Sequence, residues 1–484
     1  MLLLLQVETI QMSRTKKFKY LLPTIAVLSA CAGPSAVTDN VKQLTAPSNW
    51  SSERDASSNI EDNYIEINNW IKSFNHPQLS QLIIQATKNN YNFKAQSAKL
   101  AIAKSRIQVA DASDLPELSL SLGQSRRKSV STDETNYTNS ADINLQLSYE
   151  LDLWGKLSDE QTKAQLNYAS ELAQYQQAEL NLVADVSKAY FNLVEAKSLL
   201  SLYQERANNL KNNLEMIQSS YRLGLSDALD VYLTQNDVSR ELARIAEQQQ
   251  QVATKGRALE LLLGEYPDAD ITSDVQLTSF DTQITQGIPS DILTRRSDIM
   301  ASWYELMSLD ASLAIAHKQR FPRISLTAST GDSANELGNL LDSGAMAWSL
   351  IGNLTMPLFN AGRLAALEEQ ARLAVVQKEQ LYLQQVYQAF AEVENTLANA
   401  KALKERFNHY EKAKDNAISA ETISFDQYLK GLVTYTTVLE SQRRAFDAQS
   451  TLIQLQNQLL ANRISLFVAL GGSPFSESAN LQSK

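Results

Sequence analysis

The chain has 484 residues and a formal net charge of −10 at pH 7, and 44% of its residues are hydrophobic. This composition supports a folded core, whereas the mean hydropathy of −0.28 excludes a polytopic helical membrane protein. The acidic balance also lacks the basic footprint of a nucleic-acid-binding protein. Glycine and proline together make up only about 5% of the chain, against roughly 12% in average proteins, so we expect few turns and long helices.

The N-terminal segment has the features of a secretion signal. Residues 13–20 are cationic, and residues 21–30 form an apolar run that ends in small side chains and is too short to span a bilayer as a helix. The run leads into Leu28-Ser-Ala-Cys31, which resembles a bacterial lipobox, and Cys31 is the only cysteine. We therefore predict a lipoprotein signal peptide over residues 1–30 and lipidation, with palmitate, at Cys31. An ordinary signal peptide or anchor is the alternative, and both Met1 and Met12 are candidate starts.

The next stretch changes from an extended segment to a helix and then to strands. Residues 31–63 are polar and aperiodic, which predicts an N-terminal tether. A helical segment then runs to about Ser113, and Leu115-Pro116 breaks it. Leu118, Leu120 and Leu122 alternate with polar residues and predict a strand, which we expect to be followed by a polar loop over residues 124–140.

The clearest strand covers residues 142–153, where apolar and polar side chains alternate over about twelve residues. A tilted membrane β-strand needs roughly 9–11 residues. The alternative is an amphipathic strand of a soluble sandwich, but an unbroken polar face that carries three carboxylates suits a water-filled lumen better. The pattern therefore favours a membrane strand.

A very long helix follows, because residues 156–221 contain no glycine or proline and repeat apolar residues in heptads. Such a helix is about 100 Å long. We expect Gly224 to end it and Asp227 to cap a second helix that reaches Leu263. The helices before the strands and after Gly224 together match the long one in length, so a simple arrangement stacks the two short helices end to end beside it.

The second half of the chain repeats this plan. After an irregular connector we expect a helix to about His317, strands over residues 321–328 and 348–358, a helix over 363–428 and a last helix that ends at Leu470. Adding 207 to a residue number relates the two copies. The pairs are Gly155 and Gly362, Lys156 and Arg363, Tyr221 and Tyr428, Gly224 and Gly431, Leu225 and Leu432, Gly264 and Gly471, and Pro267 and Pro474. We predict repeat 1 over residues 64–270, a connector over 271–288, repeat 2 over 289–474 and a C-terminal tail over 475–484.

Several of these segments resemble the outer membrane factor family, the TolC-like outer-membrane lipoproteins of tripartite efflux pumps. They are the lipobox at Cys31, residues 288–299, Phe321-Pro-Arg-Ile-Ser-Leu326, Pro357-Leu-Phe-Asn-Ala-Gly-Arg363, residues 428–439 and Leu470-Gly-Gly472. The resemblance covers essentially the whole mature chain. It departs mildly at Ser297, where the family usually has proline, and at Ala361, where glycine is common.

The resemblance implies an α+β membrane fold. Three protomers would each give four strands to one transmembrane β-barrel, continuous with a long periplasmic α-helical coiled-coil barrel, and each protomer would hold two structural repeats. Four strands cannot close a membrane barrel, and open strand edges are not tolerated in lipid. At least two chains must therefore share a barrel, and the number three comes from the resemblance. We expect the protein in the cell outer membrane, lipid-anchored, with a periplasmic extension.

The resemblance also assigns the two ends of the long helices. The strand–helix junctions Gly155-Lys156 and Gly362-Arg363 would lie at the periplasmic rim of the barrel. The turns at the far end, Gly224-Leu225-Ser226 and Gly431-Leu432-Val433, would contact a periplasmic adaptor protein. Asp230, Tyr428 and Glu440 match positions of the periplasmic gate. Val433 and Thr437 replace an arginine and an aspartate of some members, so we expect weaker or differently connected gate contacts; without the resemblance, these residues are helix caps and first-turn acids.

Nothing in the sequence supports catalysis or a cofactor. His76, His317 and His409 are scattered without metal-ligand spacing, and there is no nucleophile motif or phosphate-binding loop. We therefore predict a homotrimeric, passive, gated efflux channel for drugs and other toxic small molecules, working with an adaptor protein, an inner-membrane transporter of the RND type and outer-membrane lipids. The alternatives are a periplasmic coiled-coil scaffold and the outer-membrane channel of a type I protein-secretion system. The sequence names neither the substrate nor the pump.

Overall fold

The computed structural model describes residues 37, 46–47, 49–51, 64–65, 69–74, 76–131, 134–271, 283–284, 289–340 and 346–474. Cys31, the predicted signal peptide and the C-terminal tail lie outside the described residues. The chain divides into two compact units. The sheet unit comprises the described residues of Val109–Lys163 and Leu309–Val376, and the helical unit comprises those of Thr38–Gln108, Ala164–Ser308 and Gln377–Lys484.

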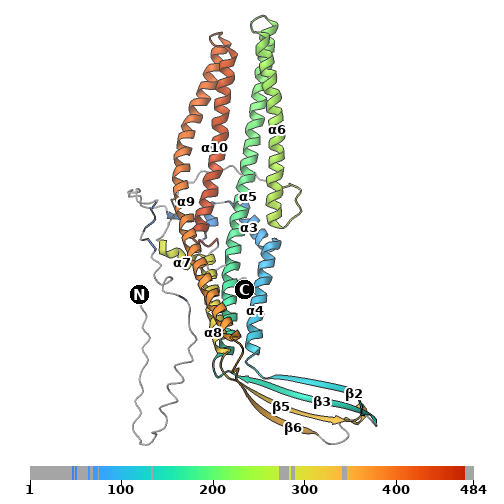
Figure 1. Cartoon of the computed structure of the whole chain (residues 1–484). Coiled ribbons are helices and arrows are strands. Elements are labelled where there is room, and N and C mark those ends of the chain that lie inside the picture. The colour runs from blue at the N-terminus through green and yellow to red at the C-terminus, as the bar shows by residue number, and fades with distance from the viewer. Residues whose placement is uncertain are drawn as a thin grey trace. The chain divides into compact units, whose positions relative to one another are not determined.

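The sheet unit is built on four antiparallel strands in the order β2-β3-β5-β6 (Figure 1). They are β2 (Glu117–Val130), β3 (Thr135–Leu151), β5 (Arg323–Ala334) and β6 (Ala347–Thr355). The register aligns the alternating patterns of all four strands, because Leu118 pairs with Leu147, Leu147 with Ala328, and Ala328 with Leu350. One face of the sheet is therefore largely apolar, and the opposite face carries polar side chains such as Ser329 and Ser349, whose hydroxyls lie 2.8 Å apart.

The predicted polar loop over residues 124–140 is wrong, because most of this stretch continues the β2–β3 hairpin. Val130 pairs with Thr135, so the ladder extends eight residues beyond Leu122. The alternation of apolar and polar side chains fades after Leu122, but backbone hydrogen bonds between antiparallel strands do not depend on it. Polar side chains on both faces of β2 are tolerated there because they are exposed and not packed into a core.

The helical segment expected to run unbroken to about Ser113 is interrupted. The structure has a short 3-10 helix, η2 (Trp70–Phe74), followed by α3 (Pro77–Asn89) and α4 (Tyr91–Ala112). The buried Asn90 lies between the last two and accepts a hydrogen bond from the Phe93 amide at 2.9 Å, which caps the start of α4. The Asn90 side-chain amide donates to the Leu262 carbonyl at 2.9 Å. The break therefore serves a contact between distant segments, which local periodicity does not reveal.

The remaining helices follow the predicted plan closely. Repeat 1 continues with α5 (Lys156–Arg222) and α6 (Ala228–Leu263). Repeat 2 has η3 (Pro289–Asp291), α7 (Ile292–Arg295), α8 (Ser297–Lys318), η4 (Leu337–Asn339), α9 (Arg363–Leu429) and α10 (Tyr435–Ala469). Strands β1 (Tyr64–Ile65) and β4 (Gln283–Ile284) form a parallel pair, so the stretch expected as an irregular connector contributes a short strand.

The internal repeat is visible in the backbone. Glycines of the three pairs related by 207 all have positive φ, at Gly155 and Gly362, Gly224 and Gly431, and Gly264 and Gly471. In the last pair, each glycine lies against the equivalent helix junction of its own repeat. A Cβ on Gly264 would lie 2.6 Å from the Asn89 carbonyl oxygen, and one on Gly471 would lie 3.0 Å from the Arg296 nitrogen. In both repeats the second long-hairpin helix thus ends against the junction between two shorter helices, which is the expected end-to-end stacking.

The main core of the helical unit is largely aliphatic and contains a cluster of aromatic side chains. Trp70 stacks on Phe467 with ring centroids 5.3 Å apart, and Phe74 packs against Phe191 at 5.5 Å. These four side chains are almost fully buried. Burying a large apolar side chain stabilises the fold by about 1.5–3 kcal/mol, so this cluster anchors η2 to α5 and α10.

Candidate functional site

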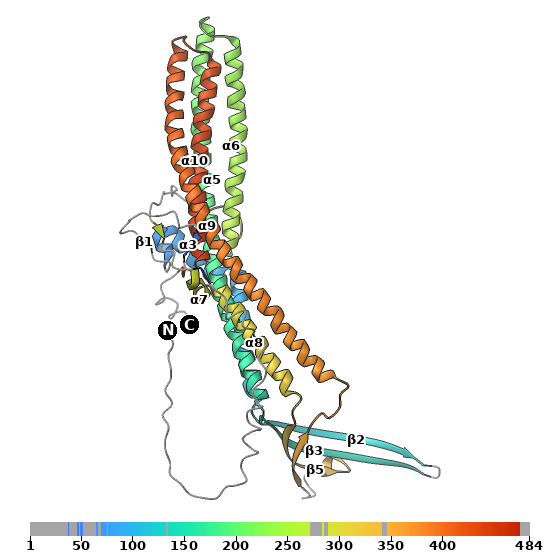
Figure 2. The same cartoon turned by 60° about the vertical axis from the view of Figure 1, so that its left-hand side comes forward.

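The helical unit contains two long helical hairpins, α5–α6 and α9–α10, that run alongside each other (Figures 1 and 2). Their turns have the same backbone geometry. The Leu225 amide donates to the Ser220 carbonyl at 2.9 Å, and the Leu432 amide donates to the Gln427 carbonyl at 2.9 Å. The glycine in each turn adopts the left-handed conformation that closes a helix in this way. In the first turn the predicted cap is confirmed, because Asp227 accepts a hydrogen bond from the Leu229 amide at 3.2 Å.

A hydrogen-bonded group, which we call the tip link, joins the two hairpins. The Tyr428 hydroxyl donates to Asp230 Oδ2 at 3.0 Å. The Ser226 hydroxyl also donates to Asp230 Oδ2 at 3.4 Å and lies 3.3 Å from the Tyr428 hydroxyl. Two predicted gate residues are thus brought together, and Ser226, predicted only as an adaptor contact, is part of the same group.

The tip link lies over a small apolar cluster. Ile217, Tyr435 and Val438 are buried there, and the Tyr428 ring packs on the Tyr435 ring with centroids 5.2 Å apart. Burial, together with the nearby Asp230 carboxylate, raises the pKa of Tyr428, although its contact with Ser226 opposes the rise. Burial raises the pKa of Tyr435 to about 12. Both phenols are therefore neutral near pH 7, and Tyr428 is able to donate its proton to the carboxylate.

The third predicted gate residue, Glu440, lies apart from the tip link. Its carboxylate accepts hydrogen bonds from Arg443 at 2.9 Å and from Arg444 at 2.8 Å, both on its own helix α10. These two bonds lower the pKa of Glu440. Within the single chain, Glu440 therefore forms a solvent-facing charge group and does not connect the hairpins.

The two turns expose apolar side chains. Leu225 is 79% exposed and Leu432 is 70% exposed, and they occupy equivalent positions in the two repeats. Val433 is half-buried, whereas Gly224 and Gly431 have open space where a Cβ would lie. Each turn therefore presents an exposed leucine next to a glycine, at equivalent positions of the two repeats.

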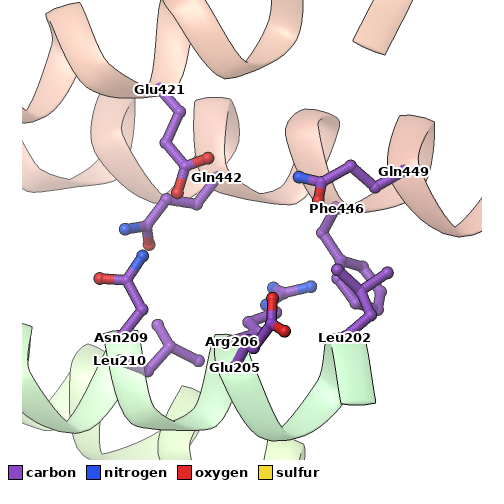
Figure 3. Close-up of a pocket in the computed structure, with 9 residues that line it drawn as sticks. All are labelled: Leu202, Glu205, Arg206, Asn209, Leu210, Glu421, Gln442, Phe446 and Gln449. Carbon is purple, nitrogen blue, oxygen red and sulfur yellow. The ribbon is translucent and has the colours of Figure 1, made fainter. Parts of the chain in front are cut away.

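The structure also contains a polar cavity that the sequence did not reveal (Figure 3). It has a volume of about 150 Å³, is partly open to solvent and is lined by side chains of α5, α9 and α10. The lining residues are Leu202, Glu205, Arg206, Asn209, Leu210, Glu421, Gln442, Phe446 and Gln449. Gln442 is buried, and its side-chain oxygen has no hydrogen-bond partner among the described residues. A cavity of this size and polarity is able to hold several water molecules.

Charged groups surround this cavity inside the helical unit. The Arg206 guanidinium lies 4.2 Å from the Phe446 ring centroid and 3.6 Å from Glu241. Glu241 on α6 is buried and also faces Arg244 at 3.9 Å. Burial raises the pKa of Glu241, although the attraction to Arg206 and Arg244 opposes the rise. Burial, together with the repulsion from Arg244, lowers the pKa of Arg206, although the attraction to Glu241 opposes the fall. The heptad pattern of α5 did not indicate this charged cluster, because Arg206 is not a heptad position but directly precedes one, Ala207.

The two strand–helix junctions are built differently. At the first, Asp152 accepts hydrogen bonds from the amides of Leu157 and Ser158 at 3.0 and 2.9 Å and so caps α5. Lys318 donates to the Gly155 carbonyl at 3.1 Å and pairs with Asp159 at 2.6 Å, while Lys156 lies 3.6 Å from Glu150. At the second junction Gly362 and Arg363 are exposed, and Ala361 before them has a φ of 50°.

The chain is similar to proteins of a known family. Residues 82–265 and 288–472 match the family described as outer membrane efflux protein, one stretch in each repeat. The chain belongs to the outer membrane efflux protein family. The predicted family is thus confirmed, and the protein is an efflux channel of the outer membrane and not an enzyme.

Relatives and solved structures of outer membrane efflux proteins agree with this assignment. The probable outer membrane lipoprotein SilC of Salmonella typhimurium is 30% identical over 404 residues, which are 83% of this chain and 87% of SilC. The cation efflux system protein CusC of Escherichia coli K12 is 28% identical over 460 residues, which are 93% and 99% of the two chains. The toluene efflux pump outer membrane protein TtgF of Pseudomonas putida is 28% identical over 84% of this chain and 85% of TtgF.

The fold is shared with solved outer-membrane channels. The Campylobacter jejuni CmeC channel has a TM-score of 0.84 at 22% identity and covers 93% of this chain and 98% of its own. The channel OprN has a TM-score of 0.82 at 22% identity, with 92% and 99% covered. The predicted fold class, two repeats that each combine a β-hairpin with long helices, is therefore confirmed.

The described residues contain neither a membrane-spanning helix nor a group of metal ligands. No helix in this part of the chain is long and apolar enough to cross a lipid bilayer. None of its His, Cys, Asp and Glu side chains form a group of three or more that would hold a metal ion.

Proposed function

We propose that this efflux protein works as a homotrimer and forms a passive duct that is gated at the hairpin turns. The observation that carries the proposal is the four-stranded sheet, apolar on one face and polar on the other. In the described residues β2 and β6 each pair along one edge only, so two sheet edges are free. Free edges are not tolerated in lipid, which supports closure of the sheet by other copies of the chain.

The polar face of the sheet supports an aqueous lumen. In membrane β-barrels apolar side chains face lipid and polar side chains face the interior. Ser119, Gln146, Ser329 and Ser349 follow one another across the four strands on the polar face. This face also carries the carboxylates of Asp142 and Glu150. A wide polar lumen of this kind discriminates little between solutes, so we assign substrate choice to the pump that delivers them.

The tip link supports gating at the hairpin turns. It joins α6 to α9, so separation of the two hairpins requires that its hydrogen bonds break. We propose that a periplasmic adaptor protein binds the exposed Leu225 and Leu432 turns and that this binding stabilises the separated state. An inner-membrane transporter, of the RND type, would supply the substrate.

The printed names of the relatives guide the substrate class only broadly. CusC is named a cation efflux protein and TtgF a toluene efflux protein, although both match this chain at 28% identity. The same kind of duct therefore serves chemically different cargo in the relatives. We propose that this chain exports small toxic molecules without recognising them individually.

Single-channel recording tests the duct and its gate together. Tyr428→Phe keeps the ring that packs on Tyr435 but removes the donor of the tip link. Loss of one part-exposed hydrogen bond to a carboxylate costs about 1 kcal/mol, which shifts the closed-to-open ratio about fivefold. We expect more frequent opening in planar bilayers that contain the purified full-length variant.

Tyr221→Phe is the matched control. Tyr221 is the equivalent of Tyr428 in the first repeat, but it is 49% exposed and its hydroxyl makes no hydrogen bond among the described residues. This variant should open as rarely as the unchanged protein. Absence of discrete conductance from every variant would contradict the duct, and equal opening of the two tyrosine variants would contradict the gate.

A further inference from the structure

The apolar face of the first hairpin continues into a cationic one. On β2 the side chains of Leu118, Leu120 and Leu122 share a face, and strand alternation places Arg126 and Lys128 on the same face farther along. Both side chains are exposed. In a chain whose net charge is −10, two cations on one strand face are a local reversal of charge.

An aromatic side chain holds the two cations. Lys128 pairs across the ladder with Tyr137, and Arg126 pairs with Asn139. The Arg126 guanidinium carbon lies 5.0 Å from the centroid of the Tyr137 ring, and the Lys128 ammonium lies 5.8 Å from it. Neither cation forms a salt bridge within the described part of the chain. The pair is therefore pre-arranged around one ring and has its charges available to a ligand.

The position of the pair along the strand matches the depth of lipid headgroups. On β3 the face shared with Leu118 is apolar from Leu151 through Leu147 to Ala141. Ten residues extend about 34 Å along a strand, or about 26 Å along the membrane normal at a tilt of about 40°, close to the apolar band of about 25 Å of membrane barrels. Asn139 and Tyr137 lie one and two steps beyond this band, so Arg126 and Lys128 lie where headgroups begin.

We propose that Arg126, Lys128 and Tyr137 form a binding surface for the phosphate groups of lipids in the outer leaflet of the outer membrane. The inference rests on the proposed function, in which the apolar face of the sheet contacts lipid. A guanidinium matches the geometry of a phosphate, an ammonium adds a second positive charge, and tyrosine is suited to the boundary between apolar and aqueous layers. The hairpin end lies opposite the strand ends that lead into α5, so the phosphates are those of the outer leaflet.

The neighbouring residue supplies a matched control. Arg127 carries the same charge and lies between the two cations in sequence, but strand alternation turns it to the polar face, where Thr138 is its cross-strand partner. If the surface simply attracts anions, the loss of any of the three cations should weaken lipid binding equally. If binding occurs on the lipid-facing side, the loss of Arg126 or Lys128 should weaken it and the loss of Arg127 should not.

The test measures binding of a diphosphorylated lipid A to the purified full-length protein in neutral detergent. Removal of two cations that act near an anionic surface weakens binding by about 30-fold, so Arg126→Gln combined with Lys128→Gln should show this loss. Arg127→Gln should bind as the unchanged protein does. Dephosphorylated lipid should bind the unchanged protein as weakly as diphosphorylated lipid binds the double variant.

Equal loss from Arg127→Gln and Arg126→Gln would overturn the proposal, as would undiminished binding by the double variant or equal binding of the two lipids. Single-channel recording of the same variants separates this result from the proposed function. Conductance that persists in the double variant shows that it is folded, and the duct then stands whatever the lipid result. Absence of discrete conductance from the unchanged protein would instead contradict the proposed duct.

Discussion

At the residue scale, three polar side chains connect the two helical hairpins. Ser226, Asp230 and Tyr428 are far apart in sequence but lie within hydrogen-bond distance, over the buried Tyr435. Burial keeps both phenols neutral, and the carboxylate is the acceptor of the group. A neutral donor and a charged acceptor make a hydrogen bond that is strong enough to hold the hairpins and weak enough to break when a partner binds.

Ala361 has a strained backbone conformation, and a single substitution should relieve this strain. Its φ of 50° is in the left-handed region, where a Cβ costs roughly 1–2 kcal/mol. Ala361→Gly should therefore raise the midpoint of thermal unfolding by about 1–3 °C, measured by circular dichroism in detergent. Ala365→Gly, an exposed position inside α9, should lower it by a similar amount because glycine disfavours a helix. A lower midpoint for the Ala361 variant would contradict the strain.

Cys31 is outside the described residues, and its lipidation stays a prediction from the sequence. A thiol is the acceptor in the lipobox, so Cys31→Ser should abolish incorporation of radioactive palmitate into the protein in growing cells. The unchanged chain serves as the control and should be labelled. Labelling of the serine variant would contradict the lipobox.

At the element scale, the ends of the long helices were predictable, and the break at Asn90 was not. Glycine and aspartate at the turns act through their own backbone and nearest neighbours, so Gly224 and Asp227 could be assigned from sequence. Asn90 instead bonds to Leu262, 172 residues away. Its role depends on the end-to-end packing of α6 on the α3–α4 junction, and nothing in the local pattern indicates this.

Asn90→Ala should therefore destabilise the helical unit. The substitution removes the cap of α4 and leaves the Leu262 carbonyl without its side-chain donor, at a cost of about 2 kcal/mol. We expect a fall of about 3–6 °C in the unfolding midpoint of the full-length protein. Asn89→Ala is the control, because Asn89 is only half-buried and its side chain makes no hydrogen bond within the described residues. Equal falls for the two variants would contradict this role of Asn90.

The sheet shows the same contrast between features with a local sequence pattern and features without one. Strand positions with regular alternation, such as Leu145 and Leu147, were predictable, whereas the extension of the hairpin to Val130 was not. Beyond Leu122 the residues satisfy a backbone ladder without a buried face, so binary patterning carries no signal there. The candidate lipid-binding side chains Arg126 and Lys128 lie in this extension, and only the register places them on the face of Leu118.

At the scale of the whole molecule, partly buried charged groups lie between the two hairpins. The polar cavity beside Phe446 brings Glu421 of α9 opposite Glu205 and Arg206 of α5. Burial raises the pKa of Glu421 above its ordinary value of 4.5, although Arg206 opposes this. Because the folded state binds this proton more strongly than the unfolded state, the stability contributed by Glu421 is present below pH 4.5 and is lost as pH rises through the raised pKa.

Glu421→Gln should remove this dependence. The amide resembles the protonated acid, so the variant should unfold about 1–2 °C above the unchanged protein at pH 7.5 and at the same temperature at pH 4. Glu411→Gln, at an exposed position of α9, should leave the midpoint unchanged at both pH values. A lower midpoint for the Glu421 variant at pH 7.5 would show that its attraction to Arg206 exceeds the cost of burial.

The tip link belongs to one chain, since Ser226, Asp230 and Tyr428 all come from the same polypeptide. In the proposed trimer each subunit therefore has its own tip link. A cell that expresses both the unchanged gene and Tyr428→Phe would assemble channels in which zero, one, two or three tip links are broken. Leakage of such a cell, which averages over these channels, should rise gradually with the share of mutant gene product, so the variant should be neither fully dominant nor fully recessive.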